Sequence, residues 1–169
     1  MISPNSPPSQ DELRHLGTLP KHQIVDRLYG HPMLFGKYVL KHHLGDDSPP
    51  MHTEMLDLLE RCYQYLALIA PRGHAKSTVV NMVWLLYRIC FKLETFIIQI
   101  SESKEQSANF LEAIKVEVEE NQLLQYLFGD LKSADRWSNN DLHFSNGIYL
   151  AAKGSGQKIR GMKRRSYRP

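Results

Sequence analysis

The segment 70–78, with the sequence A-P-R-G-H-A-K-S-T, combines residue types that bind phosphate groups. Lys76-Ser77 follows a glycine-containing loop and precedes a long apolar stretch. In loops of this kind the backbone N–H groups surround a β-phosphate, the lysine reaches the β- and γ-oxygens, and the hydroxyl coordinates Mg²⁺. The segment therefore predicts a nucleotide-binding loop, with Lys76 on the phosphates and Ser77 as the metal ligand.

The loop departs from the pattern G-x-x-x-x-G-K-[S/T] at two positions. Ala70 and Ala75 stand where that pattern has glycine. Because glycine reaches positive φ angles freely and alanine does not, we expect Ala75 to avoid them and Gly73 to supply the flexibility of the loop. An ordinary strand-to-helix turn with a chance Lys-Ser pair is the alternative interpretation.

The elements on either side are those that a phosphate loop requires. Residues 65–70 have the length and composition of a buried parallel strand, and residues 78–91 indicate a helix that packs back on it. A second β-rich run, 95–100, ends at the polar turn Ser101-Glu102-Ser103. The pattern predicts a strand–helix–strand unit with the loop after its first strand.

Helices are predicted upstream of this unit, and both helices and strands are predicted downstream of it. Ser9 and Glu12 have capping-box spacing, as do Ser103 and Gln106 ahead of an amphipathic helix. The other predicted elements are helices over 20–29, 31–43, 51–62 and 121–128, and a hairpin of 141–144 with 147–152 around Ser145-Asn146-Gly147. The alternation of strands and helices favours a largely parallel sheet, with antiparallel strands only late in the chain.

This organisation gives three segments. Residues 1–10, which hold three prolines and three serines, are expected to be a disordered lead. Residues 11–62 form a helical N-terminal segment, and residues 63–169 form the nucleotide-binding core.

Composition limits the class of protein. The chain has 169 residues, of which 42% are hydrophobic, enough for one domain with a core. No run approaches 18 apolar residues and the N-terminus lacks a secretory pattern, so we expect no membrane span and a cytoplasmic location. Cys62 and Cys90 have no second cysteine at metal-ligand spacing, and we expect both to be free, buried thiols.

Charge is concentrated at one end of the chain. Residues 153–169 contain seven of the 21 lysines and arginines and no acid. Such a segment binds phosphates, either of a nucleic acid backbone or of a nucleotide held by a neighbouring subunit. A solvated end without specific contacts is the alternative.

Taken together, residues 51–169 resemble the ATPase domain of the large terminase subunit of tailed bacteriophages. The similarity rests on the order and spacing of several motifs. They are Pro-Arg-Gly-x-Ala-Lys-Ser at 71–77, the strand ending Ile100-Ser101-Glu102-Ser103 before a helix with Ala108, Trp137 ahead of the Asn146-Gly147 hairpin, and G-Q-K-I-R-G at 156–161.

The resemblance implies an α/β fold of the ASCE-type P-loop NTPase class, with a mainly parallel sheet flanked by helices. It also implies a motor that hydrolyses ATP, with Mg²⁺, to drive double-stranded DNA into a capsid. Such a motor works as a homo-oligomeric ring on the portal protein, with the small terminase subunit as a further partner, in the cytoplasm of a bacterial host.

Site residues follow from the resemblance position by position. Lys76 and Ser77 would be the phosphate lysine and the Mg²⁺ ligand, and Thr78 would lie near the α-phosphate. Gly73, His74 and Ala75 would lend backbone N–H groups. Two catalytic arginines are also implied. Arg72 would sense the γ-phosphate, and Arg160 would reach a neighbouring subunit's nucleotide, with Arg164 and Arg165 as competitors for that role.

The sequence ends at Pro169, where members of that family continue into the strand that carries the Walker B acid and the catalytic glutamate. We therefore expect an incomplete sheet, weak nucleotide binding and little hydrolysis by this chain alone. Two other functions remain open. One is a non-catalytic nucleic-acid-binding module with a vestigial phosphate loop, and the other is a different P-loop DNA motor, such as a helicase-like or transposition ATPase.

Overall fold

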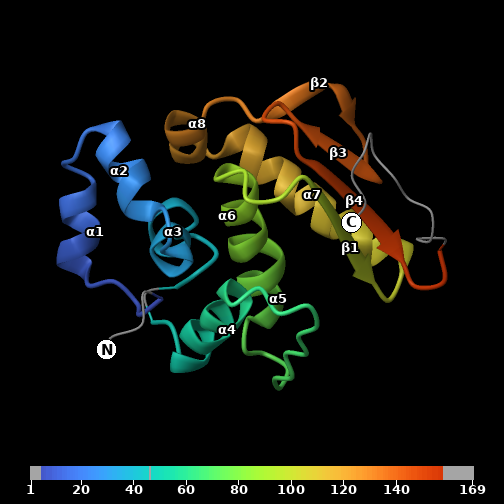
Figure 1. Cartoon of the computed structure of the whole chain (residues 1–169), viewed down its shortest axis with the longest axis horizontal. Helices are drawn as coiled ribbons and strands as arrows, with labels where there is room; N and C mark the ends of the chain where they lie inside the picture. Colours follow the sequence, from blue (N-terminus) through green and yellow to red (C-terminus); the bar gives the residue numbers. More distant parts are fainter. Residues whose placement is uncertain (1–4, 46, 158–169) are drawn as a thin grey trace. The chain divides into compact units, whose positions relative to one another are not determined.

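A computed structural model describes residues 5–45 and 47–157 (Figure 1). The chain divides into two compact units, Met1–Tyr87 and Arg88–Pro169. The described part of the first unit is helical, and the sheet belongs to the second. None of the described helices is both long enough and apolar enough to cross a membrane.

The first unit begins with the predicted helical segment. Its helices are α1 (Gln10–Leu16), α2 (Lys21–Leu28), α3 (Pro32–Val39) and α4 (Pro50–Glu60). The capping position was predicted correctly, because the Ser9 hydroxyl accepts a hydrogen bond from the Glu12 N–H at 3.1 Å. Part of the expected disordered lead is packed instead. Asn5 is fully buried, and its side-chain amide donates to Asp57 at 2.8 Å and to Glu60 at 2.7 Å.

The predicted helix after the loop forms as three consecutive pieces. They are α5 (Lys76–Thr78), the π-helix η1 (Val79–Trp84) and α6 (Leu85–Cys90). Within the first unit η1 packs against α3 and α4, and the side chains of Val79 and Val83 are fully buried. Gly36 of α3 makes this packing possible, since a Cβ at that position would lie 2.7 Å from Val83 Cγ1.

The strand predicted over residues 65–70 does not form. The segment has no regular secondary structure and most of its side chains are exposed, Tyr65 to 87% and Ile69 to 96%. An apolar run becomes a strand only where another strand pairs with it and buries one face. No strand lies within residues 5–45 or 47–87, so nothing in the described part of this unit pairs with the segment.

The second unit contains a four-stranded mixed sheet. Its strands are β1 (Phe96–Ser101), β2 (Lys132–Trp137), β3 (Asp141–Phe144) and β4 (Tyr149–Gly154), in the order β1-β4-β3-β2. Only β1 and β4 are parallel, and the other two pairs are antiparallel. The prediction of a mainly parallel sheet was wrong. Strand β2 was not predicted, because its sequence K-S-A-D-R-W lacks apolar alternation.

Two helices of the second unit follow the predicted pattern. α7 (Lys104–Glu120) packs across β1 and β4, and α8 (Gln122–Phe128) packs against α7 (Figure 1). Leu111, Ile114 and Val118 are fully buried on one face of α7. Ser103 caps α7 by accepting from the Gln106 N–H at 3.1 Å. The fold class predicted from the sequence is thus confirmed at the level of an α/β fold with helices flanking a sheet.

We expect Gly36→Ala to destabilise the first unit by about 1–3 kcal/mol, because the new Cβ would overlap the buried Val83 side chain. Trp84 and Trp137 are the only tryptophans, one in each unit. Urea unfolding followed by Trp84 emission in a Trp137→Phe background therefore measures this unit. Gly45→Ala is the matched control, since a Cβ there meets no atom within 4 Å. Equal stability of the two variants would contradict the packing described.

Glu119 of α7 joins β2 to that helix. Its carboxylate accepts from Lys132 Nζ at 2.6 Å and from Trp137 Nε1 at 2.7 Å. The hydrogen bond from Lys132, supported by that from Trp137, lowers the pKa of Glu119. A lowered pKa means that the contact stabilises the fold above the ordinary carboxyl pKa of about 4.3 and is lost on further acidification.

We therefore expect Trp137 emission, in a Trp84→Phe background, to change as the pH falls below about 4. In Glu119→Gln the same transition should be absent, because glutamine does not titrate. A transition of equal size in both proteins would assign the change to another group.

Candidate phosphate-binding site

The loop enters the helix through two left-handed residues. Gly73 has φ +84°, and Ala75 has φ +50° and ψ +21°. The expectation that Ala75 avoids positive φ was wrong. The path of the loop imposes this conformation at the position where the sequence pattern has glycine, and alanine adopts it at a cost of about 1–2 kcal/mol. The turn directs the chain into the helix that begins at Lys76.

Three alternate carbonyls of the loop are held by side-chain donors. The Lys76 ammonium donates to the Ala70 carbonyl at 3.3 Å, and His74 Nδ1 donates to the Arg72 carbonyl at 3.1 Å. His52 Nε2, from α4, donates to the His74 carbonyl at 3.0 Å. A carbonyl oxygen can only accept, so these contacts require a proton on His74 Nδ1 and on His52 Nε2.

These contacts also orient the backbone N–H groups. In a trans peptide the carbonyl and the following N–H point in opposite directions. The N–H groups of Gly73 and Ala75 therefore point away from the donors that hold the carbonyls of Arg72 and His74. The first turn of the helix adds further N–H groups, because Ala75 offers no side-chain cap and they lack intrahelical acceptors. Clustered N–H groups of this kind carry partial positive charge.

The predicted binding residues 72–78 therefore lie in one continuous stretch around the start of the helix. Arg72 and Ser77 are exposed, and Lys76 and Thr78 are half-buried. The side chains of Arg72, Ser77 and Thr78 form no hydrogen bond or ion pair within residues 5–45 and 47–157. Arg160, Arg164 and Arg165 lie outside the described residues, so their predicted roles stay predictions.

His52 was not among the predicted site residues. It lies on the face of α4 that carries Met55 and Leu56, and its side chain is 4% exposed. A histidine on the apolar face of a helix normally belongs to a core, and nothing in the sequence indicates that this one contacts His74. The contact follows from the way α4 packs beside η1.

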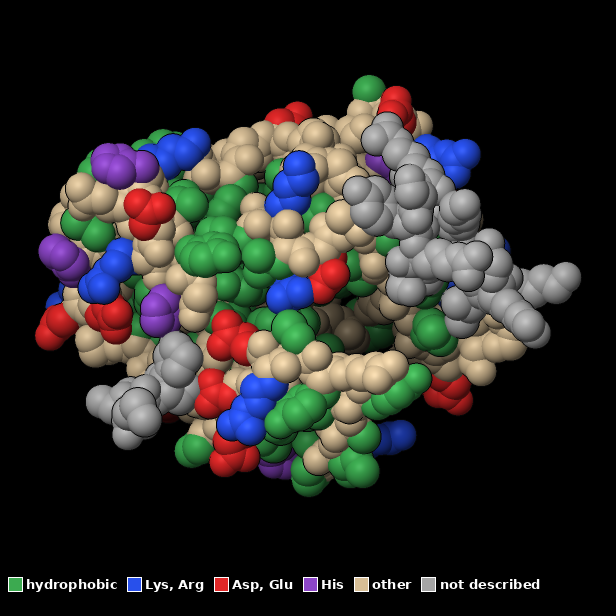
Figure 2. Space-filling view, in the orientation of Figure 1, with side chains coloured by type: hydrophobic (Ala, Val, Ile, Leu, Met, Phe, Trp, Pro, Cys, Tyr) green, Lys and Arg blue, Asp and Glu red, His purple; other side chains and the backbone are tan. Residues whose placement is uncertain are grey.

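The two cysteines differ from the expectation of two buried thiols. Cys62 is exposed, whereas Cys90 is half-buried. Burial raises the pKa of the Cys90 thiol, which keeps it protonated and unreactive at neutral pH. Tyr63, Tyr65 and Ile69, which follow Cys62 in the chain, are also exposed. Figure 2 shows hydrophobic side chains at the surface in the lower part of the view.

Comparison with protein-family models, with curated proteins and with solved structures finds no match. The chemistry assigned to the loop thus depends on the sequence motif and on the geometry described above.

We expect Ala75→Gly to raise the stability of the first unit by up to about 1 kcal/mol, because glycine adopts the left-handed conformation without strain. Urea unfolding monitored through Trp84 measures the change. Ala70→Gly is the control. It has no positive φ to relieve and should be neutral or slightly destabilising. Stabilisation of the same size in both variants would mean that Ala75 carries no particular strain.

Proposed function

We propose that this chain is the nucleotide-binding part of an ATP-driven motor that packages double-stranded DNA, of the kind formed by large terminase subunits. The observation that carries the proposal is the direction of the Gly73 and Ala75 N–H groups, away from the side chains that hold the loop carbonyls, together with the uncapped first helical turn that contains Lys76. Two left-handed residues followed by a helix form a concave set of donors that suits a phosphate group.

The residues fit a nucleotide phosphate chain. Lys76 now donates to a neutral carbonyl, and a charged phosphate oxygen is the stronger acceptor. The Lys76 ammonium would therefore leave the Ala70 carbonyl oxygen and donate to a phosphate oxygen. Arg72 is an exposed residue of the loop and can add a second positive charge. When bound, ATP with Mg²⁺ would supply the phosphoryl group whose transfer drives such motors, and the Ser77 hydroxyl would be the protein ligand to the ion.

A DNA-packaging role draws further support from the basic end of the chain. Residues 153–169 carry seven positive side chains and no acid, which suits the phosphates of double-stranded DNA. Residues 158–169 lie outside the described residues. The portal protein, the small terminase subunit and a ring of copies belong to this proposal as partners of the motor, in the cytoplasm of a bacterial host.

The test is equilibrium binding of a fluorescent ATP analogue with Mg²⁺ to the wild type and to Lys76→Ala. We expect Lys76→Ala to weaken binding at least tenfold, because it removes the charge that pairs with the phosphates. The control is Lys41→Ala, an exposed lysine of the same unit. It should bind as the wild type does, and excess pyrophosphate should displace the analogue. Equal binding by wild type and Lys76→Ala, or no binding by either, would contradict the proposal.

Binding to double-stranded DNA separates the motor from a simple nucleic-acid-binding module. The slope of log affinity against log salt counts the phosphates that the basic segment neutralises. A chain that binds DNA with such a slope, but binds no ATP analogue, would be a module with a vestigial loop. A chain that binds both agrees with the motor.

A further inference from the structure

We propose that His52 is a positioning residue for the phosphate loop, one that keeps the Ala75 N–H turned toward the ligand side. The inference rests on the proposed function, because it concerns how the same loop is made ready for an anion. The residue acts through the backbone of His74 and does not itself touch the phosphate.

The ring of His52 forms one hydrogen bond, and the loop receives it. Nε2 donates to the His74 carbonyl at 3.0 Å, whereas Nδ1 is buried and has no hydrogen-bond partner within the described residues. An unsatisfied buried polar atom costs about 1–3 kcal/mol. A leucine at this position would pack beside Met55 and Leu56 without that cost. The polar ring therefore contributes to the fold through its contact with the loop.

The helix that carries His52 is held firmly within its unit. α4 packs against η1, which follows the loop in the chain. Residues of α4 also bind Asn5, whose amide donates to Asp57 and Glu60 and whose carbonyl accepts from Thr53 Oγ1 at 2.9 Å. The Nε2 donor therefore has a fixed place relative to the start of the helix at Lys76.

The hydrogen bond opposes a specific rearrangement, namely rotation of the peptide between His74 and Ala75. Such a rotation changes ψ of His74 and φ of Ala75 together, and it would take Ala75 out of the strained left-handed region. It would also turn the His74 carbonyl toward the ligand and the Ala75 N–H away from it. A phosphate would then meet the His74 carbonyl, which repels it, in place of the Ala75 N–H, which attracts it. The strain of Ala75 therefore favours the orientation that cannot bind a phosphate, and the hydrogen bond from His52 opposes that rotation.

The experiment compares His52→Gln with His52→Leu. The glutamine amide nitrogen can occupy the place of Nε2 and keep the donor, whereas leucine fills the space without one. We expect His52→Leu to weaken binding of the fluorescent ATP analogue about fivefold, which corresponds to the loss of one hydrogen bond, and His52→Gln to restore most of it. The midpoint of thermal unfolding of His52→Leu should be unchanged or higher, since leucine removes the unsatisfied atom.

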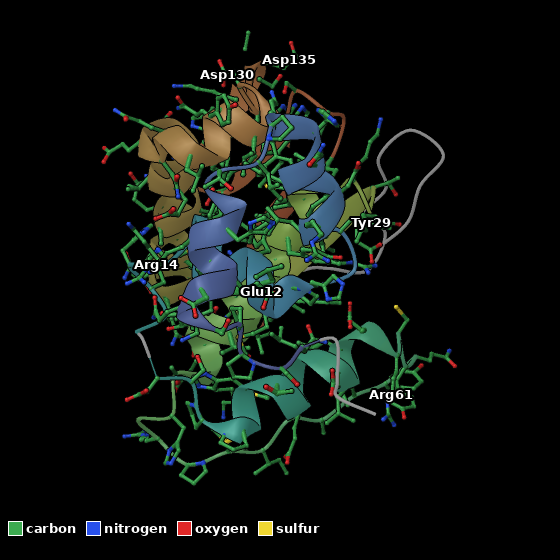
Figure 3. The ribbon with its side chains drawn as sticks, turned by 90° about the vertical axis from the view of Figure 1, so that its left-hand side faces the viewer. Glu12, Arg14, Tyr29, Arg61, Asp130 and Asp135 are labelled. Atoms are coloured by element: carbon green, nitrogen blue, oxygen red, sulfur yellow. The ribbon has the colours of Figure 1, made fainter. Side chains whose placement is uncertain are left out.

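A second readout needs no ligand. Trypsin can cut after Arg72, within the loop, and after Arg61, at the carboxyl end of α4 (Figure 3). The rate of cleavage in a folded protein follows the population of the open form when reclosing is fast. We expect the rate of cleavage after Arg72 to rise about fivefold in His52→Leu and to stay near the wild-type rate in His52→Gln. The rate of cleavage after Arg61 should be the same in all three proteins.

The outcomes are separable. Wild-type rates and affinity in His52→Leu would overturn the positioning role. So would parallel increases at Arg61 and Arg72 with a lower unfolding midpoint, which would make His52 a residue of the core only. If the wild type itself binds no ATP analogue, the proposed function fails, and the trypsin rates still decide whether His52 holds the loop.

A double variant adds a further test of the strain argument. With glycine at position 75 the left-handed conformation costs little, so the peptide gains nothing by rotating. We expect His52→Leu to weaken binding less in an Ala75→Gly background than in the wild type. Equal losses in the two backgrounds would show that strain at Ala75 does not drive the rotation.

Discussion

The candidate site depends on the left-handed conformation at Gly73 and Ala75. These two residues turn the chain into the helix that begins at Lys76, and their conformation helps to set the direction of the peptide groups just before it. At Gly73 the conformation is free of strain. At Ala75 it is opposed by about 1–2 kcal/mol, so contacts elsewhere in the unit must hold it.

Those contacts are the hydrogen bonds to the carbonyls of Ala70, Arg72 and His74. At about 0.5–1.5 kcal/mol each, they suffice to offset the strain at one alanine. Two of the three come from within the loop, and the third comes from α4. Within the described residues, these hydrogen bonds connect the loop both to the start of the helix and to α4. α4 in turn packs against the π-helix η1.

Local features were predicted well from the sequence. Ser9 and Ser103 cap the helices that their spacing indicated, and the helix predicted over 121–128 ends where Gly129 has φ +78°, because these features depend on a few neighbouring residues. Features that depend on contacts with residues distant in the sequence were not predicted well. Residues 65–70 have the composition of a strand, but none of the described strands pairs with them, and β2 pairs with β3 despite a polar sequence.

The Lys-Ser pair indicated where a candidate site would lie, because charge and hydroxyl chemistry belong to single residues, and its binding role stays a prediction. The local geometry around the pair was predicted less well. The conformation of Ala75 was predicted wrongly. The tendency of alanine to avoid positive φ applies to an unconstrained residue, whereas the path of the loop constrains Ala75. The hydrogen bond between His52 and the loop was not predicted, because it arises from the packing of α4 against η1, which no spacing in the sequence encodes.

The central claim is that the N–H groups around Ala75 and Lys76 receive a phosphate. The most direct measurement is a titration of ¹⁵N-labelled protein with pyrophosphate, observing the backbone amide resonances. We expect the amide signals of Gly73, Ala75, Lys76 and Ser77 to move first and furthest, because these groups would donate to the anion. Unchanged signals at these positions, with shifts confined to the basic residues of 153–169, would contradict it.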